Sequence, residues 1–336
     1  MTSRFRRWAF ALGAVVFVAG ASLVGALSAS GNGLPPLPDF VPTDPAPTPK
    51  PKYRAVVADV AVDRTGCEAL PSNIRPGGET VWTLPGARPR QYLVHFPQTG
   101  RTGQKLPLVL NFHGLAADGQ IQADLSGFHA VADRNGFIVV SPDGSGEPRG
   151  WNALLRPLGA GDDVAFTGQL LDKLEQDFCV DTARVYAAGF SSGAMMASRL
   201  ACRLGSRVAA AGAVAGVYKP AEQCGRPVPV VAVHGTADDT VPFEQGRIIE
   251  QTPYPGAHAA ISAWASSGST CTPTAELFTM TPSVAREQFR GCGRNESLLY
   301  IVYGGGHTWP DELATADILW SFFRDHPMPA ETPVKK

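Results

Sequence analysis

One serine of this chain lies in a pattern that suits nucleophilic chemistry. The β-branched and aromatic run that begins at Val185 ends at Gly189, and an Ala/Met-rich helical pattern begins at Gly193. Between them, the letters G-F-S-S-G place Ser191 in a G-x-S-x-G pattern. A serine on so tight a strand-to-helix turn has a strained backbone, and glycine is needed on both sides because side chains there would collide. We therefore expect Ser191 Oγ to be exposed at a helix N-terminus, which stabilises developing negative charge.

A histidine that can act as the general base lies in the segment G-G-G-H-T-W-P at 304–310. A serine nucleophile needs a base to take its proton and an acid to orient that base. The segment follows the apolar run Leu298–Val302, and its glycines allow the imidazole of His307 to approach the serine closely. His113 and His234 stand before glycines at the ends of other apolar runs, and we interpret both as structural. The remaining histidines have no such context: His95, His129, His258 and His326.

Two neighbouring carboxylates are candidates for the orienting acid. The segment H-G-T-A-D-D-T-V-P at 234–242 follows the apolar run Val228–Val233. In parallel-sheet folds with a G-x-S-x-G serine, the order along the chain is serine, acid, histidine. Loops at the carboxyl ends of parallel strands also converge on one side of the sheet. Both Asp238 and Asp239 satisfy this order, and the order alone does not choose between them.

Two backbone N–H groups are candidates for binding an oxyanion. One belongs to Ser192, directly after the nucleophile. The other comes from the turn that follows Phe112, where Gly114 permits a close bend, and we assign it to Leu115.

Three side chains are candidates for substrate binding. Trp151 and Asn152 in G-W-N, and Trp309 in H-T-W-P, lie on loops near the expected site. They could line an acyl or aromatic pocket. Tryptophan also packs in protein cores, so the alternative for both indoles is a structural role.

These loops require strands that alternate with helices. The predicted strands are Thr80–Leu84, Arg90–Phe96, the run 106–114, 136–140, Arg184–Ala188, Val208–Val214, Val228–Val233 and Leu298–Val302. Four helices are predicted. The first contains Leu125, Phe128 and Val131 and stops near Gly136. The second is capped by Asp162 and has an apolar face of Val164, Leu170, Leu171, Leu174 and Phe178, and the other two are His258–Ser267 and Thr315–Asp325. This alternation predicts an α/β fold with a mostly parallel central sheet and helices on both faces.

The two ends of the chain are predicted to lie outside the folded domain. Residues 1–30 combine three arginines with a long apolar run and small residues, which indicates a secretory signal peptide, with an uncleaved membrane anchor as the alternative. Residues 31–60 are rich in proline and indicate an extended linker. A single catalytic domain is expected at 61–327, followed by a tail at 328–336. Removal of the signal takes the formal net charge from −1 to −4, which argues against nucleic acid as a partner.

Cysteine usage fits an exported protein. The chain has six cysteines, which suggests three disulfides. We predict Cys271–Cys292, which would tie the excursion before the last strand, then Cys179–Cys202, and by elimination Cys67–Cys224. There is no C-x-x-C, H-E-x-x-H or P-loop pattern, and G-S-G at 144–146 is followed by Glu-Pro, so the sequence predicts neither a metal nor a cofactor.

The chain resembles the secreted polyhydroxybutyrate-depolymerase-like esterases, which are related to feruloyl and acetyl xylan esterases. The matching segments span roughly 65–325. They are N-F-H-G, A-D-R-N-G-F-I-V-V-S-P-D-G, G-W-N, G-D-D-V-A-F, C-V-D-T-A-R-V-Y-A-A-G-F-S-S-G, H-G-T-A-D-D-T-V-P and G-G-G-H-T-W-P.

This resemblance implies an α/β-hydrolase fold and a serine mechanism without metal. Carried over by position, it makes Ser191 the nucleophile, His307 the base and Asp238, in H-G-T-x-D, the acid. One departure is Ser192, because members of the family often have asparagine there.

The sequence thus predicts a secreted, monomeric serine esterase acting on a small ester or on a polyester or polysaccharide ester, without a stable membrane partner once the signal is cleaved. Two alternatives remain: an acyltransferase of the mycolyltransferase type, and a non-catalytic cell-surface binding protein on a hydrolase scaffold. Ala215–Pro227 is too short and polar for an apolar lid, and Thr272–Arg290 is the expected cap. We therefore expect short acyl groups of about two to four carbons, or hydroxycinnamoyl groups, because a long acyl chain needs an apolar groove.

Overall fold

A computed structural model describes most of the chain after Gly66. The described residues are 67–154, 161–220, 224–226, 228–244, 246–249, 252–266, 274–290, 296–310 and 313–329. They belong to one compact unit, Val60–Lys336. The predicted signal peptide and linker lie outside the described residues. No helix in the described part of the chain is both long and apolar enough to cross a membrane.

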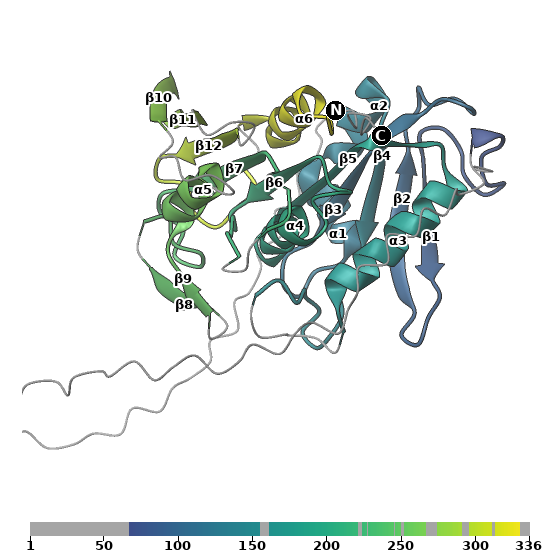
Figure 1. Ribbon diagram of the computed structural model, residues 1–336, viewed down its shortest axis with the longest axis horizontal. Coiled ribbons are helices and arrows are strands. Elements are labelled where there is room, and N and C mark those ends of the chain that lie inside the picture. Colours follow the sequence, from purple (N-terminus) through teal and green to yellow (C-terminus); the bar gives the residue numbers. More distant parts are fainter. Residues whose placement is uncertain are drawn as a thin grey trace, which may run out of the picture. The chain divides into compact units, whose positions relative to one another are not determined.

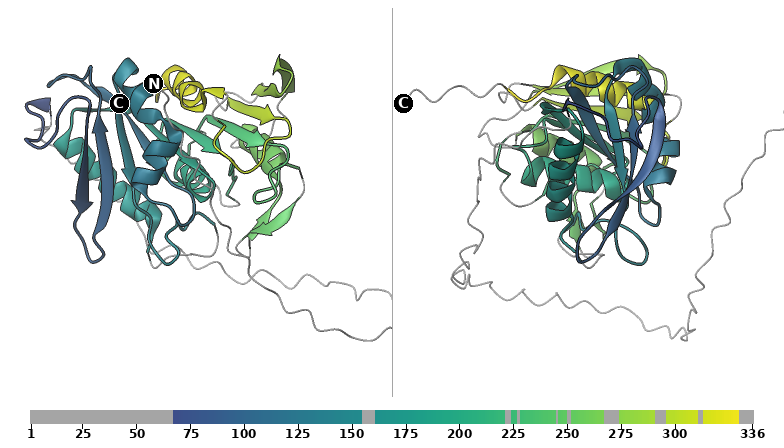
Figure 2. Two further views of the ribbon diagram at one scale, coloured as in Figure 1. Left: turned by 180° about the vertical axis from the view of Figure 1, so that it is seen from behind. Right: turned by 90° about the vertical axis from the view of Figure 1, so that its right-hand side faces the viewer.

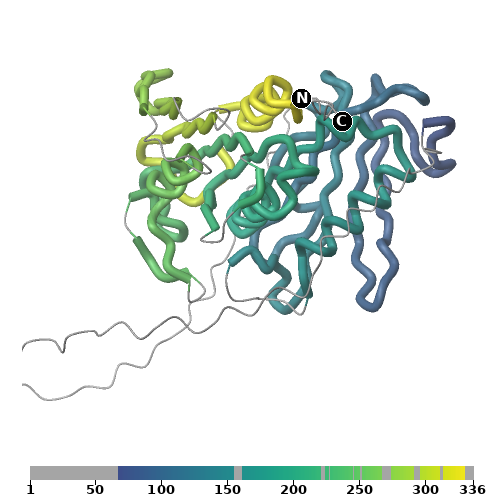
Figure 3. The backbone as a smooth tube through the Cα atoms, viewed as in Figure 1, coloured from purple at the N-terminus to yellow at the C-terminus, as the bar shows by residue number. Residues whose placement is uncertain are grey.

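A single large sheet runs through the described domain (Figure 1), and Figure 3 shows the course of the backbone in the same view. Its strands lie in the order β1-β2-β4-β3-β5-β6-β7-β12-β11-β10. They are β1 Gly78–Leu84, β2 Arg90–Phe96, β3 Leu106–Phe112, β4 Ile138–Pro142, β5 Val180–Phe190, β6 Ala210–Val214, β7 Val230–Gly235, β10 Thr274–Thr281, β11 Val284–Arg290 and β12 Ser297–Val302. In this order, the six neighbouring strands β4, β3, β5, β6, β7 and β12 are parallel, and antiparallel strands extend the sheet at both edges. The short strands β8 Arg247–Ile249 and β9 Thr252–Tyr254 pair separately.

Helices cover both faces of the sheet (Figures 1 and 2). They are α1 Gly119–Ser126, α2 Phe128–Asn135, α3 Asp163–Asp177, α4 Ser192–Arg203, α5 Ala257–Ala265 and α6 Thr315–Asp325. Successive residues of β3 therefore pack against helices on opposite faces. Leu108 and Leu110 pack in the cluster that includes α3 and α4, whereas Val109 packs in the cluster that includes α2 and α6. A parallel strand covered on both faces is apolar throughout. The α/β fold predicted from the sequence is confirmed.

Two predicted segments form elements other than those expected. The helical pattern around Leu125 and Phe128 is divided into α1 and α2, because Gly127 between them adopts a left-handed conformation with φ 68°. The expected cap at Thr272–Arg290 is, over its described residues, the antiparallel hairpin β10–β11, which continues the sheet. β10 is exposed along its whole length, so the mixture of polar and apolar residues in this segment is that of an exposed edge strand.

The disulfides correct two predicted pairs. The structure joins Cys67 to Cys179 and Cys202 to Cys224, instead of Cys179 to Cys202 and Cys67 to Cys224. The error lies in the length of β5. We expected five residues, about 17 Å, but the strand has eleven residues and rises about 36 Å, while the twelve residues of α4 return only about 18 Å. Cys202 therefore does not reach the beginning of β5, next to which Cys179 lies.

The third predicted pair, Cys271–Cys292, lies outside the described residues and stays a prediction. The structure assigns the other four cysteines to two bonds, so an all-oxidised chain leaves only this pairing. Peptide mapping of the purified chain without reduction should give three linked pairs: Cys67–Cys179, Cys202–Cys224 and Cys271–Cys292. A peptide that links Cys271 or Cys292 to any other cysteine would contradict the prediction.

Candidate active site

Ser191 lies on a strained turn between β5 and α4. Its backbone has φ 54° and ψ −119°, a conformation that side-chain-bearing residues rarely adopt. A Cβ at Gly189 would lie 2.4 Å from the carbonyl carbon of Gly193, and a Cβ at Gly193 would lie 2.1 Å from Phe112 O. No side chain fits at either position, which is the steric reason for the two glycines of G-F-S-S-G.

The turn is also held from the side of β6. The N–H of Ser191 donates to Val214 O at 2.9 Å. A Cβ at Gly216 would lie 2.3 Å from Ser191 O, so the chain after β6 passes directly against the serine. These contacts offset the cost of the positive φ, which is of order 1–3 kcal/mol.

The imidazole of His307 lies between the serine and an aspartate. Its Nε2 is 2.9 Å from Ser191 Oγ, and its Nδ1 is 2.8 Å from Asp238 Oδ2. The proton positions follow from the partners: a carboxylate only accepts, so Nδ1–H donates to Asp238 and Nε2 accepts from the hydroxyl. The ring of Phe190 packs against the imidazole at a centroid distance of 5.1 Å.

Asp238 is buried and saturated with donors. Its Oδ1 accepts the N–H groups of Thr240 at 2.9 Å and Val241 at 2.8 Å. Burial alone would raise its pKa, but hydrogen bonds from His234 and His307 and from the Val241 N–H outweigh burial and hold the pKa well below its usual range. The carboxyl group is therefore ionised at any pH at which the imidazole can act as a base.

Asp239, the other carboxylate that the sequence leaves open, lies elsewhere. Its side chain is exposed, and its backbone carbonyl accepts a hydrogen bond from the guanidinium of Arg247. The structure thus brings Ser191, His307 and Asp238 together and leaves Asp239 outside the group.

His234 is a neighbour of the acid that the sequence did not reveal. Its Nε2 lies 2.8 Å from Val241 O and 3.3 Å from Asp238 Oδ2, and neither His234 nor Asp238 has an exposed side chain. The structural interpretation of His234 holds, but the residue also supports the carboxylate. Its position four residues before Asp238, at the end of β7, is the signal that could have found it.

The loops that carry the acid and the base are joined through their backbones. Ala237 N–H donates to Gly305 O at 2.8 Å, and Gly304 N–H donates to Thr236 Oγ1 at 2.8 Å. A Cβ at Gly235 would lie 2.1 Å from Gly305 O. The separation between Asp238 and His307 therefore depends on a close backbone approach that only glycine permits.

The two predicted oxyanion donors belong to segments that adjoin the serine. Ser192 begins α4, where the first N–H groups have no intrahelical acceptor. A Cβ at Gly114 would lie 3.6 Å from Ser191 Cβ, so the turn that contains Leu115 adjoins the nucleophile. In the described part of the chain the N–H of Leu115 has no acceptor, whereas that of Ala116 donates to Arg149 O at 2.7 Å.

His113 fixes the loop that follows it. Its Nε2 accepts the N–H of Gly144 at 2.8 Å, its Nδ1 lies 2.7 Å from Gly114 O, and its own carbonyl accepts the indole N–H of Trp151 at 2.8 Å. Burial lowers the pKa of His113, so the ring is neutral and a backbone N–H can donate to it. This agrees with the structural role predicted for His113.

The predicted substrate contacts of the two tryptophans are wrong. Trp151 is 1% exposed and packs edge-on against Phe112, and Trp309 is 6% exposed and packs edge-on against Phe128. Both indoles belong to the hydrophobic core. Asn152 is partly buried and donates from its backbone to Asp163 Oδ2 at 2.7 Å and from its amide to Gly161 O, so it joins the loop to the start of α3.

Metal-ligating side chains gather at one place among the described residues. The group consists of Glu79, His95 and His129. These residues come from β1, β2 and α2, none of which carries a residue of the serine, histidine and aspartate group.

Comparison with known proteins identifies the family of this chain. The family model described as Esterase PHB depolymerase matches residues 91–278. The Nocardia uniformis protein NocK, which is named as an esterase, is 30% identical over 297 residues, covering 80% of this chain and 84% of that protein. Feruloyl esterase B of Piromyces equi is 31% identical over 258 residues, covering 71% of this chain.

The chain spans only 46% of that feruloyl esterase and 22% of a bifunctional acetylxylan esterase/xylanase of Neocallimastix patriciarum. Among solved structures, acetyl xylan esterase from Aspergillus awamori aligns over 73% of this chain and 99% of its own, with a TM-score of 0.57 and 18% identity. That likeness confirms the α/β-hydrolase fold.

The contact between the loops that carry Asp238 and His307 can be tested by substitution. Gly235→Ala would force the Gly305 backbone away and displace His307, so we expect kcat/KM for an ester to fall by roughly 10²-fold or more. Gly306→Ala is the matched control, because a Cβ there meets nothing within 4 Å. It should stay within about threefold of the parent, since the loop need not move. Equal rates for the two variants, with unchanged circular dichroism, would show that the contact does not set the position of the base.

Proposed function

Because the chain belongs to the family of PHB depolymerase esterases, we propose that it is an exported serine esterase that forms an acyl-enzyme on Ser191. The observation that carries the proposal is the chain of hydrogen bonds from Ser191 Oγ through His307 to Asp238, at 2.9 and 2.8 Å. Two disulfides and the apolar run near the N-terminus support action outside the cytoplasm. We propose that the exported enzyme acts as a monomer.

In the acylation step, Ser191 Oγ attacks the ester carbonyl carbon while His307 Nε2 takes its proton. Asp238 keeps Nδ1 of the ring protonated and stabilises the imidazolium that forms. The N–H groups of Leu115 and Ser192 then donate to the oxyanion of the tetrahedral intermediate. The bond to the alcohol oxygen breaks, the alcohol leaves with the proton of His307, and the acyl group remains on the serine.

In the deacylation step, water replaces the alcohol and the same groups act again. His307 takes a proton from water as the water oxygen attacks the acyl carbonyl, and returns it to Ser191 Oγ as the carboxylic acid leaves. An acyltransferase would use a sugar or lipid hydroxyl in this step instead of water, so product analysis with and without an alcohol acceptor separates the two activities.

The proposed substrates are esters with short acyl groups, or hydroxycinnamoyl esters. The names of the relatives, feruloyl and acetylxylan esterases, support this range. In the two segments that could form a lid, between β6 and β7 and between α5 and β12, the described residues form no helix. Hydroxybutyrate oligomers belong to the same range of small acyl groups.

The roles of the three residues can be tested by substitution. Ser191→Ala and His307→Ala should each lower kcat by roughly 10⁴–10⁶-fold while the protein stays folded, because the residues act as a unit. Asp238→Asn should cost about 10⁴-fold, since the amide no longer fixes the imidazole tautomer. Asp239→Asn, at the exposed neighbour, is the matched control and should keep most of the activity. Full activity of Ser191→Ala would contradict the serine mechanism, whereas lack of labelling of the parent by a fluorophosphonate would favour a binding protein over an enzyme.

A series of esters tests the substrate range. We expect catalytic efficiency on p-nitrophenyl esters to peak at about two to four acyl carbons, because each further methylene needs apolar surface worth about 0.8 kcal/mol. Methyl ferulate and hydroxybutyrate oligomers, assayed at matched concentration, then distinguish the two acyl classes. Efficiency that still rises beyond about eight carbons would contradict the short-acyl proposal.

A further inference from the structure

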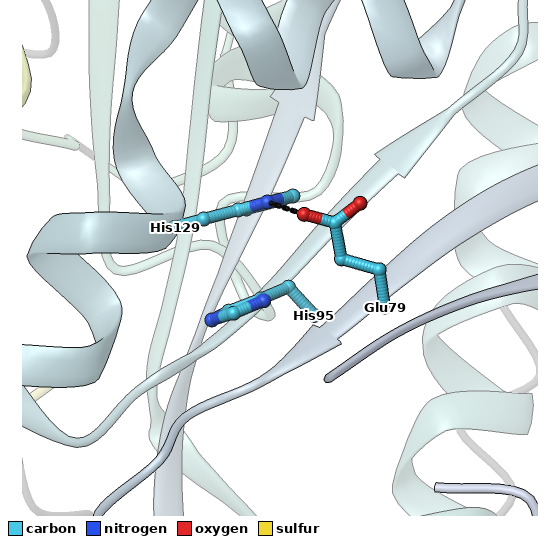
Figure 4. A group of neighbouring side chains, drawn as sticks. All are labelled: Glu79, His95 and His129. Atoms are coloured by element: carbon cyan, nitrogen blue, oxygen red, sulfur yellow. Dashed lines mark hydrogen bonds and ion pairs between the residues drawn. The ribbon is translucent and has the colours of Figure 1, made fainter. Parts of the chain in front are cut away.

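Two histidines and a glutamate form a cluster between the first two strands and α2 (Figure 4). Glu79 and His95 are directly opposite each other in the β1–β2 pair. His129, in the first turn of α2, lies over them, and its ring stacks on that of His95 with centroids 4.3 Å apart. One nitrogen of each ring and one carboxylate oxygen lie within 4.8 Å of one another.

In each imidazole, one nitrogen is within hydrogen-bond distance of a carboxylate and the other has no hydrogen-bond partner among the described residues. His95 Nε2 is 2.9 Å from Asp133 Oδ1, and His129 Nδ1 is 2.7 Å from Glu79 Oε1. The other nitrogens, His95 Nδ1 and His129 Nε2, are sealed from solvent and have no hydrogen-bond partner among the described residues. A ring that donates to a carboxylate from one nitrogen presents a bare lone pair at the other, which is the arrangement of metal-ligating histidines.

The charge of the cluster also favours a cation. Glu79 and Asp133 are both carboxylates, and in the described part of the chain neither forms an ion pair with a lysine or arginine. With neutral imidazoles, the cluster and the adjacent Asp133 together therefore have two negative charges. The Glu79 side chain is 43% exposed and that of His129 is 16% exposed, so an ion can enter from solvent, while that of His95 is 3% exposed.

We propose that Glu79, His95 and His129 bind one divalent transition cation of the Zn²⁺ type. Two imidazoles and a carboxylate are a common donor set for Zn²⁺, with water in a fourth position. Asp133 is not a ligand here. It holds His95 by Nε2 and leaves Nδ1 without a hydrogen-bond partner among the described residues.

Binding requires a defined movement of two side chains. The stacked rings are 9° from parallel, and each lone pair lies in the plane of its own ring, so the two cannot meet at one ion in the stack. Tetrahedral ligand atoms at 2.0–2.1 Å from Zn²⁺ lie about 3.3 Å apart. Binding therefore requires that the His129 ring rotate about its Cβ–Cγ bond and that Glu79 move from that ring to the ion, while Asp133 holds His95 in place.

The consequence would be a cross-link between three elements. The ligands come from the edge strand β1, from β2 and from α2, so the bound ion would hold an edge of the sheet to the helix that covers it. An ion that binds the folded chain and not the unfolded chain raises the midpoint of unfolding as its concentration increases. The cluster thus predicts stabilisation by metal that does not depend on esterase activity.

The test is titration of the full chain, free of any histidine tag, with Zn²⁺ against a chromophoric chelator, together with thermal unfolding. We expect one Zn²⁺ per chain, a rise in Tm that EDTA reverses, and a Co²⁺ adduct with the visible absorption of a tetrahedral site. Glu79→Gln and His129→Gln keep the size of the side chains and should weaken binding at least tenfold and remove most of the rise in Tm. Asp133→Asn should weaken binding by roughly ten- to hundredfold through His95.

His258→Gln is the matched control. His258 also lies beside carboxylates, at 2.8 Å from Glu287 and 3.6 Å from Glu244, but outside the cluster, so this variant should bind Zn²⁺ as the parent does. Absence of saturable binding below about 1 mM Zn²⁺, or equal binding by the parent, Glu79→Gln and His129→Gln, would overturn the proposal.

Discussion

The close approach of backbone to backbone at the carboxyl edge of the sheet is the constraint on which the site depends. At the turn that carries Ser191, a Cβ added at Gly189 would lie 2.4 Å from the carbonyl carbon of Gly193, and one added at Gly193 would lie 2.1 Å from Phe112 O at the end of β3. The loops that carry the acid and the base meet in the same way at Gly235, where an added Cβ would lie 2.1 Å from Gly305 O. Reactive side chains from three separate loops can reach one another only because these glycines let the main chain carrying them come together.

The electrostatics of the site follow from that packing. Close loops exclude water from Asp238, and burial would by itself raise the pKa of its carboxyl group. The same loop supplies two backbone N–H groups, and β7 supplies His234, so the charge is stabilised by fixed dipoles instead of solvent. A carboxylate held in this way has one orientation, which fixes the tautomer and direction of the imidazole of His307.

The sequence predicted best what depends on short-range steric rules. The glycines around Ser191 and the loops after β7 and β12 follow from turn geometry and strand order, and they located the three groups of the site. Prediction from the sequence failed for features that depend on the length of an element or on tertiary packing. The pair Cys179–Cys202 required a short β5, and the composition of Trp151 and its loop does not show whether the indole faces a pocket or the core. The cluster of Glu79, His95 and His129 depends on strand register and on the position of a helix, which no local pattern contains.

The chain holds two histidine–carboxylate systems whose chemistry differs because of the second ring nitrogen. In both, a carboxylate accepts from one nitrogen and fixes the ring: Asp238 for His307, at 2.8 Å, and Glu79 for His129, at 2.7 Å. At His307 the other nitrogen faces a hydroxyl, so its lone pair can take a proton and return it. At His129 the other nitrogen faces no donor among the described residues, and the neighbouring ring of His95 has a bare nitrogen of its own. A lone pair beside a proton donor is a general base, whereas two lone pairs beside carboxylates that form no ion pair with a lysine or arginine in the described part of the chain are ligands for a cation.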